Sequence, residues 1–389
     1  MNMNMKERDA FKENLQKMNK HYLDSQQKYK IQKYWSGHSR IINKQVEVIR
    51  GNIFSSNWYF ATTFGGGASN GNLDIFNKIR NSTSYKIIDK LHSLLSRFFS
   101  KTTLLNPLWR YVTLKRYLWM HTRLACGNYL ELVNAYYRLL EKEIIKYNID
   151  SPNIYDIDLV EIDGKKFSCQ TLKKFSLFLQ ILNLKPSKLD IVVEIGAGVG
   201  ELARIFITTG TIRKYIIVDI PPTLAFSQHY LSTVLPIEKI EFFDPNRTSI
   251  DLSGDWLCCF LTPDQLTHIP NFDLGLNFFS FGEMTPNLVH SYINELKKKD
   301  FQEFVSINHR IFKNYNESKF GEKEYIKIFG PEYEVKSKYS WDSFRIGSHI
   351  LEDTPNVHGY QLLHFIKRNN FNLTSIEKKG QFETPQKLS

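Results

Sequence analysis

The sequence predicts an α/β protein in which a Rossmann-like, doubly wound sheet over residues 156–389 follows a mainly helical N-terminal domain over residues 1–155. At 389 residues the chain exceeds the roughly 100–200 residues of one ordinary domain, so two domains are expected. From about residue 170, short apolar runs alternate with amphipathic segments, as in parallel strands joined by crossover helices. Before residue 150 the apolar residues recur at three- and four-residue spacing, which indicates helices.

In the N-terminal domain we expect helices over Ile87–Phe99 and Tyr117–Tyr147. The segment Phe64–Gly71 carries a glycine cluster, but no strand–turn–helix pattern with Lys-Ser/Thr follows it. A connecting loop is therefore favoured over a phosphate-binding loop. The polar stretch Asn148–Asn153, which contains Pro152, is the predicted joint between the domains.

The second domain is predicted element by element. The elements are a helix over Thr171–Leu184, a strand over Ile191–Ile195, a helix over Glu201–Thr208, a strand over Tyr215–Ile220, a helix over Thr223–Leu235, and strands over Ile240–Phe243, Phe272–Phe279 and Phe304–Asn308. After Lys313 we expect closing strands, with a loop over His349–Tyr360 and a last element over Leu362–Lys367.

Composition narrows the class of protein. With 42% hydrophobic and 23% charged residues and no long apolar stretch, we expect a globular chain without a membrane span. The first residues of the chain do not resemble a secretory signal, so we expect the protein in the cytoplasm. The four cysteines, Cys126, Cys169, Cys258 and Cys259, lack metal-site spacing, and no other set of metal ligands stands out. A net charge of +11 suits an anionic partner, such as nucleic acid, an acidic sugar polymer or a nucleotide-linked sugar. The N-terminal helices are expected either to cover the acceptor or to form a homo-oligomer contact, and the sequence leaves both open.

A glycine-rich turn follows the first predicted strand of the sheet. The sequence Val192-Val-Glu-Ile-Gly-Ala-Gly-Val-Gly200 runs from a buried strand ending at Glu194 into Gly196, Gly198 and Gly200, after which a helix begins. Glycines at such a turn let the backbone bend sharply and approach a ligand closely, at the sheet edge where open α/β folds bind ligands. This pattern predicts a nucleotide-type site.

Two ligands compete for this turn. Gly198, Gly200 and Ala203 also satisfy the dinucleotide pattern G-x-G-x-x-A, which would place a pyrophosphate at the helix N-terminus. A carboxylate at Glu194 would repel that pyrophosphate by on the order of a kcal/mol or more, whereas it attracts the cationic S-adenosylmethionine. The electrostatics therefore favour S-adenosylmethionine as the cofactor.

Acidic residues after the next two strands add to this prediction. Asp219, with Ile220 beside it, ends the second strand and is expected to accept hydrogen bonds from the ribose hydroxyls; helix capping before Pro221 is the alternative. Asp244, just past the third predicted strand, is expected to receive the adenine amino group, although capping a turn with Pro245 explains it nearly as well.

The segment Asn277-Phe-Phe-Ser-Phe-Gly-Glu-Met284 ends the fourth predicted strand, where the methyl acceptor is expected beside the cofactor. Asn277 is predicted to contact the cofactor there. Methyl transfer to a hydroxyl requires alignment and removal of a proton, and Glu283 and His309 are the predicted general bases. Each also has a plain structural interpretation, and His349 and His358 are weaker alternatives.

These segments resemble the sugar O-methyltransferases of bacterial surface-polysaccharide clusters. The resemblance rests on Val193–Gly200, on Asp219-Ile-Pro-Pro-Thr-Leu-Ala-Phe-Ser-Gln228 with Tyr230-Leu-Ser232, on Ser280–Met284, and on the flanking Glu161–Gly164 and Ser306–His309. It covers roughly residues 155–310. It implies a class I methyltransferase fold and a sugar hydroxyl as the methyl acceptor, in surface polysaccharide or nucleotide-sugar modification.

Three other functions compete with this one. A nucleic-acid methyltransferase is encouraged by the charge and by 28 phenylalanines and 20 tyrosines that could stack on bases, but Asn277 is followed by Phe278-Phe279 in place of the Pro-Pro-Tyr/Phe of amino-methylating enzymes. A non-catalytic nucleotide-binding scaffold is disfavoured by the intact glycines and Asp219. An NAD-dependent oxidoreductase ranks third.

Overall fold

The computed structural model of the chain describes residues 13, 17, 20, 130, 133–153, 159–184, 189–309, 311, 312, 320–341 and 360–368. Several predictions lie outside these residues. They are the helix over Ile87–Phe99, the loop over Phe64–Gly71, the first part of the helix over Tyr117–Tyr147, the domain boundary at residue 155, and the histidines His349 and His358.

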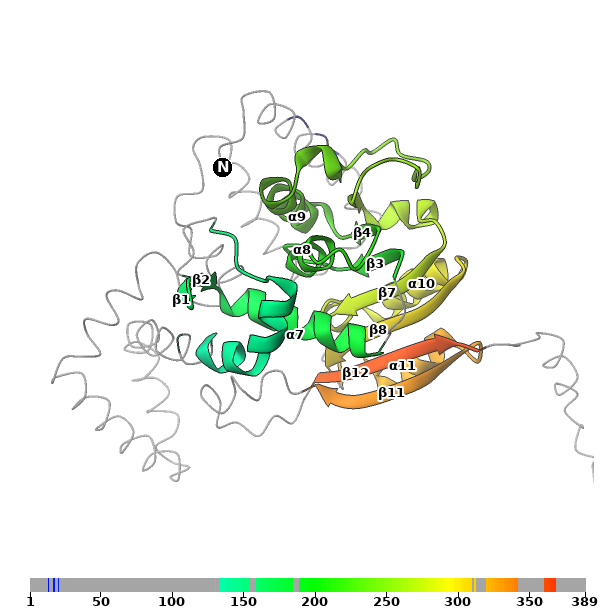
Figure 1. The fold of residues 1–389 in the computed structure, drawn as a ribbon. Coiled ribbons are helices and arrows are strands. Elements are labelled where there is room, and N and C mark those ends of the chain that lie inside the picture. The colour runs from blue at the N-terminus through cyan, green and yellow to red at the C-terminus, as the bar shows by residue number, and fades with distance from the viewer. Residues whose placement is uncertain are drawn as a thin grey trace, which may run out of the picture.

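An eight-stranded sheet forms the centre of the described structure, in the order β11-β12-β8-β7-β3-β4-β6-β5 (Figure 1). In chain order its strands are β3 (Ile191–Ile195), β4 (Lys214–Val218), β5 (Ile240–Glu241), β6 (Cys258–Leu261), β7 (Phe272–Phe278), β8 (Phe301–His309), β11 (Tyr333–Trp341) and β12 (Tyr360–Lys367). The strands from β8 to β5 run parallel, whereas β12 and β11 are antiparallel to their neighbours.

The chain builds the sheet in two directions from β3. It first adds β4, β5 and β6 on one side, and then returns to pair β7 and β8 on the other. The strand order therefore reverses between β3 and β7, which is the switch point where open α/β sheets bind ligands. This confirms the predicted doubly wound sheet.

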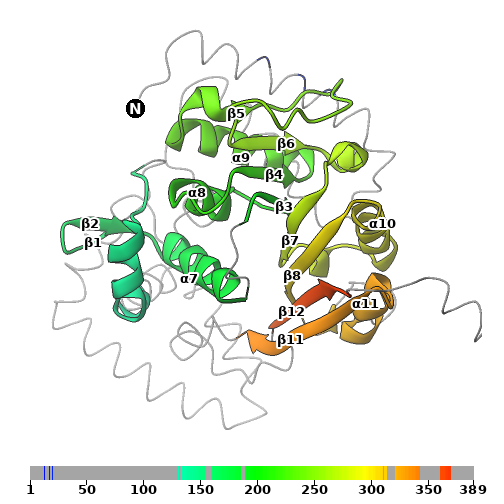
Figure 2. The same ribbon diagram turned by 45° about the vertical axis from the view of Figure 1, so that its right-hand side comes forward.

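Helices cover both faces of the sheet (Figure 2). One face packs against α7 (Cys169–Leu184), α8 (Glu201–Thr208) and α9 (Pro221–Val234). The other packs against the 3-10 helix η2 (Pro263–His268), α10 (Pro286–Lys297) and α11 (Glu322–Phe329). Each face thus buries its own hydrophobic cluster.

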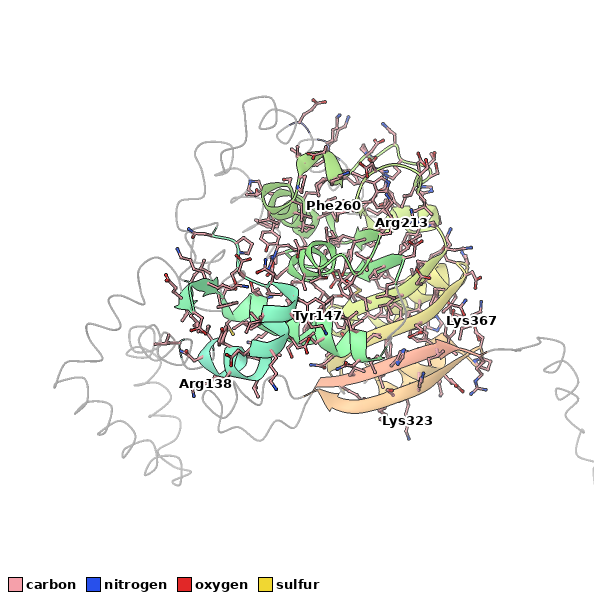
Figure 3. All side chains as sticks on the ribbon, in the orientation of Figure 1. Arg138, Tyr147, Arg213, Phe260, Lys323 and Lys367 are labelled. Atoms are coloured by element: carbon pink, nitrogen blue, oxygen red, sulfur yellow. The ribbon has the colours of Figure 1, made fainter. Side chains whose placement is uncertain are left out.

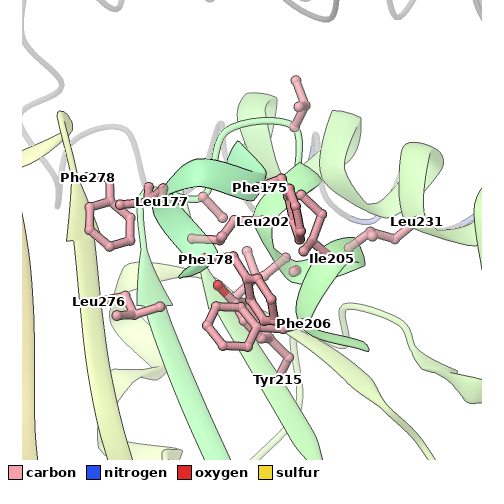
Figure 4. Packing of buried hydrophobic residues seen from close by; sticks show 14 of the residues in the cluster. Phe175, Leu177, Phe178, Leu202, Ile205, Phe206, Tyr215, Leu231, Leu276 and Phe278 are labelled. Atoms are coloured by element: carbon pink, nitrogen blue, oxygen red, sulfur yellow. The ribbon is translucent and has the colours of Figure 1, made fainter. Parts of the chain in front are cut away.

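Aromatic rings pack against one another within the cluster on the α7 face (Figure 4). Phe178 of α7 meets Phe206 of α8 edge to face, with ring centroids 4.9 Å apart. A helix over residues 133–147 joins the same cluster, since its Tyr147, seen in Figure 3, packs against Phe175 and Phe178 at 6.0 and 5.4 Å. The end of the N-terminal region therefore shares a core with the sheet.

Shorter elements complete the described structure. They are the hairpin β1 (Val160–Ile162) and β2 (Lys165–Phe167), the pair β9 (Ile311–Phe312) and β10 (Phe320–Gly321), and the 3-10 helices η1 (Ile237–Lys239) and η3 (Phe281–Glu283). No helix in the described part of the chain is both long and apolar enough to cross a membrane.

The third predicted strand, over Ile240–Phe243, is shorter in the structure and lies at the edge of the sheet. Only Ile240–Glu241 form a strand, the edge strand β5. The strand ends there because the Phe243 backbone N–H donates to Gln228 Oε1, at 2.7 Å, and not to a neighbouring strand. The place beside β4 belongs to β6, which the sequence analysis did not predict. Four apolar residues leave too short a pattern to separate a strand from a loop.

Candidate functional site

The glycine turn after β3 has the geometry that its sequence predicts. Gly196, Gly198 and Gly200 have φ angles of 75°, 62° and 83°, all in the left-handed region. A Cβ added at Gly196 would lie 2.1 Å from Ser280 Oγ, so a side chain is excluded there by close packing. A Cβ at Gly198 would meet nothing within 4 Å, so the turn leaves open space above this residue.

Asp219 joins the end of β4 to the glycine turn. Its Oδ2 accepts a hydrogen bond from the Gly198 backbone N–H at 3.1 Å, and its Oδ1 accepts one from the Ile220 N–H at 2.7 Å. The side chain is largely buried. The carboxylate therefore lies beside the open space of the turn, and its binding of ribose hydroxyls stays a prediction.

Glu194, the fourth residue of β3, is fully buried on the face that α7, α8 and α9 cover. The Tyr215 hydroxyl donates to its Oε2 at 2.7 Å. Burial raises the pKa of Glu194, while the charge of Lys174 and the bond from Tyr215 lower that pKa in part. Its other oxygen, Oε1, has no hydrogen-bond partner among the described residues. The site thus contains a buried carboxylate with one unsatisfied acceptor.

A second buried carboxylate, Glu201, is saturated. It begins α8 and takes two hydrogen bonds from Arg204, at 2.9 and 2.8 Å, with both side chains almost fully buried. The hydroxyls of Thr171 in α7 and Tyr230 in α9 also donate to it. Burial by itself raises the pKa of Glu201, but the charge and bonds of Arg204 outweigh burial and hold this pKa below its usual value. The cluster fastens the three helices together and offers no free group to a ligand.

The polar residues at the end of β7 bind one another. The Asn277 amide donates to the Ile195 carbonyl at 2.9 Å and to Ser280 Oγ at 2.5 Å, and its oxygen accepts from Asn308 Nδ2 at 2.8 Å. Asn308 in turn accepts from the Gly282 N–H at 2.9 Å. Asn277, predicted to contact the cofactor, thus ties together the ends of β3, β7 and β8 and is fully buried.

Phe279, the residue after β7, has an unusual backbone. Its φ angle is 69°, and its N–H donates to the Ile307 carbonyl at 2.7 Å. Bulky residues rarely adopt this conformation, and such positions cluster at functional sites. Lys174 of α7 places its Nζ 5.9 Å from the Phe279 ring centroid. Neither Lys174 nor Phe279 was predicted as a site residue from the sequence.

The two predicted general bases lie at the same sheet edge as the glycine turn. Glu283 ends η3, directly after β7, and His309 is the last residue of β8, which the structure extends past its predicted end. Because β3, β7 and β8 are parallel neighbours, their carboxyl ends lie together. The backbone therefore brings Glu283 and His309 to one side of the turn and Asp219 to the other.

Asp244 follows a strand that β6 separates from β4, and its contact with the adenine stays a prediction. It follows edge strand β5, is exposed, and accepts a hydrogen bond from the Asn246 N–H at 3.0 Å. The segment beside β4 is instead Thr262–Gln265, whose Gln265 donates to the Asp244 carbonyl at 2.7 Å. The apolar run before Thr262, followed by a Thr-x-x-Gln helix start, is the signal that could have located β6.

Among the described residues, no three His, Cys, Asp or Glu side chains gather as a metal site requires.

Comparisons with known proteins follow from this geometry. No protein-family model matches the chain, and no curated protein matches it. Among solved structures it is similar to the magnesium protoporphyrin IX methyltransferase of Synechocystis with bound S-adenosylmethionine, at 12% identity over 51% of this chain and 79% of that one, with a TM-score of 0.34. It is also similar to an S-adenosylmethionine-dependent methyltransferase from Clostridium acetobutylicum, at 8% identity over 61% and 99% of the two chains and a TM-score of 0.35. A third similar structure is the N-methyltransferase NodS of Bradyrhizobium japonicum, at 11% identity over 51% of this chain and 97% of that one, with a TM-score of 0.35. Likeness at this level carries no argument about the reaction of this chain.

Proposed function

We propose that this chain is an S-adenosylmethionine-dependent O-methyltransferase whose acceptor is a sugar hydroxyl. The observation that carries the proposal is the pairing of Asp219 with the Gly198 N–H beside the open space over Gly198, at the switch point of the sheet. A nucleoside can approach the backbone there, and a carboxylate is in place for its ribose.

The charges at the site favour this cofactor over a dinucleotide. The buried Oε1 of Glu194 lacks a partner, and burial raises the pKa of this carboxyl group. A cationic ligand nearby would stabilise the ionised form, whereas a pyrophosphate would raise the pKa further. The residues therefore fit the ammonium and sulfonium of S-adenosylmethionine. When bound, this cofactor supplies an activated methyl group.

The protein's own residues would then position the reactants. Asp219 binds the ribose hydroxyls, and Gly198 lets the backbone approach the nucleoside. Glu283 and His309 stand at the carboxyl ends of β7 and β8 as the two candidates for removing the acceptor proton. The hydrogen-bonded Asn277 and Asn308 hold these two strand ends in register.

A sugar acceptor is supported by the resemblance of Asp219–Gln228 and Ser280–Met284 to the sugar O-methyltransferases. The deciding experiment incubates the protein with S-adenosylmethionine labelled in the methyl group and with separate panels of nucleotide-sugars, oligosaccharides and RNA. We expect label in a sugar-containing acceptor. Label in RNA alone would show that the acceptor is a nucleic acid and not a sugar. Intact cofactor binding without transfer to any panel would favour a non-catalytic scaffold.

The same assay tests the base. Glu283→Gln is expected to keep cofactor affinity while losing turnover, because the amide cannot take the proton. Glu324→Gln on the exposed surface of α11 serves as the matched control. Normal turnover in Glu283→Gln would exclude Glu283 as the general base and leave His309 as the candidate.

A further inference from the structure

Lys174 is held at the sheet edge by its neighbours in α7. One turn before it, the Thr171 hydroxyl donates to Glu201 at 2.7 Å and fixes the start of α7 against the start of α8. The Nζ of Lys174 lies 5.9 Å from the centroid of the Phe279 ring, at the end of β7. Lys174 therefore spans from the helix layer to the point where the glycine turn and the end of β7 come together.

The ammonium of Lys174 has charged neighbours but no hydrogen bond to any described residue. Burial lowers the pKa of Lys174, and the carboxylates of Glu194 and Glu201, which attract the ammonium, raise this pKa in part. Arg204 already neutralises Glu201 through two hydrogen bonds, and Glu194 is shared with Tyr215. Because a lysine ammonium carries three donors, and withdrawing a charge from water is costly, this group requires an anionic partner.

We propose that Lys174 binds the α-carboxylate of the methionine part of the cofactor. The inference rests on the proposed function and adds an anion subsite to it. A methionine group carries one ammonium and one carboxylate, and the site supplies an unsatisfied carboxylate oxygen at Glu194 and an unbonded ammonium at Lys174. The pair is complementary to such a zwitterion.

Calorimetry with two ligands tests the assignment. S-adenosylhomocysteine retains the amino-acid group, whereas 5′-methylthioadenosine has the same nucleoside without it. We expect Lys174→Gln to weaken S-adenosylhomocysteine by about tenfold or more and to change 5′-methylthioadenosine by less than about twofold. Lys174→Arg should restore most of the affinity. Lys173→Gln, the next-door position on α7, is the matched control and should leave both ligands unchanged.

The outcomes separate this inference from the proposed function. Equal weakening of both ligands in Lys174→Gln would mean that the residue only supports the fold, and unchanged binding of both would remove it from the subsite. Unchanged S-adenosylhomocysteine binding with a raised KM for nucleotide-sugars alone would assign the anion to the acceptor's phosphate and overturn the proposal. A wild-type protein that binds 5′-methylthioadenosine and S-adenosylhomocysteine equally would overturn it as well, whereas one that binds neither would overturn the proposed function itself.

Discussion

Asp219 has a structural role at the glycine turn beside the ligand-binding role proposed for it. Its two oxygens each accept a backbone N–H, one from Gly198 across the switch point and one from Ile220 next to it. The residue therefore orders the turn before the ligand arrives.

We predict that Asp219→Ala lowers the affinity for S-adenosylhomocysteine by about a hundredfold, because two hydrogen bonds to a charged group are lost. Titration calorimetry measures it. Asp251→Ala is the control, since Asp251 likewise accepts a nearby backbone N–H, from Ser253 at 2.8 Å, but lies exposed away from the turn. Wild-type affinity in Asp219→Ala would contradict the site.

Gly198 and Gly210 form a natural matched pair. Their φ angles are 62° and 64°, and a Cβ at either would meet nothing within 4 Å. Alanine at either position should lower the free energy of unfolding by about 1–2 kcal/mol through backbone strain. Only Gly198→Ala should also weaken cofactor binding, because only there would the methyl group fill the space of the nucleoside. Equal binding by both variants, measured by calorimetry alongside urea unfolding, would place the ligand elsewhere.

At the scale of elements, α9 holds the end of β4 in place. It begins at Pro221, two residues after Asp219, its Gln228 side chain accepts a hydrogen bond from the Phe243 N–H next to β5, and its Tyr230 hydroxyl donates to Glu201 of α8. The helix and the strands thus pack around buried polar groups as well as apolar ones. One of these polar groups, His229, makes the stability of the protein depend on pH.

His229 in α9 is buried, and burial lowers its pKa from 6.5 to about 4. Between these values the unfolded chain binds a proton that the folded chain does not, so the free energy of unfolding falls as pH drops from 6.5 toward 4. The loss from this residue approaches about 3 kcal/mol. Urea unfolding at several pH values measures it.

The variant His229→Leu should flatten this pH dependence, whereas His290→Gln on the exposed side of α10 should keep it. The pKa of Glu201 is held below its usual value, so the stability it contributes is lost only at more acidic pH, below about 4.5. An unchanged slope above pH 4.5 in His229→Leu would show that another group titrates there.

At the scale of the whole molecule, the sheet order decides where a ligand can bind. The chain reverses direction between β3 and β7, and the helices on both faces leave the strand ends as the place where loops from distant segments meet. Asp219, Glu283 and His309 belong to three separate segments of the chain, at or after the ends of β4, β7 and β8, and these parallel strands end at the same edge of the sheet.

We predict that S-adenosylhomocysteine raises the thermal unfolding temperature while NAD does not. At a concentration of a hundred times Kd, binding adds about 2.7 kcal/mol to the free energy of unfolding, which corresponds to several degrees. Differential scanning calorimetry measures the shift, and Asp219→Ala should lose it. A shift produced by NAD alone would contradict the choice of cofactor.

The local pattern of the sequence determined the segment from β3 to α8. Both elements have their predicted bounds, because five apolar or buried residues, three glycines and an amphipathic turn leave few alternatives. The doubly wound sheet was predicted from the alternation of apolar runs and helices. The position of Asp219 at the sheet edge, next to the glycine turn, was predicted from its place at the end of a strand. These features depend on neighbours in sequence.

Only the tertiary structure decided which strand lies beside β4 and what surrounds Glu194. The four residues of β6 become a strand because long-range pairing with β4 and β5 supplies their hydrogen bonds, which no short window reveals. Likewise, Tyr215 and Lys174 reach Glu194 from other elements and change its charge balance. Packing brings such groups together across the chain, and their electrostatics depend on burial and distance, which sequence spacing does not encode.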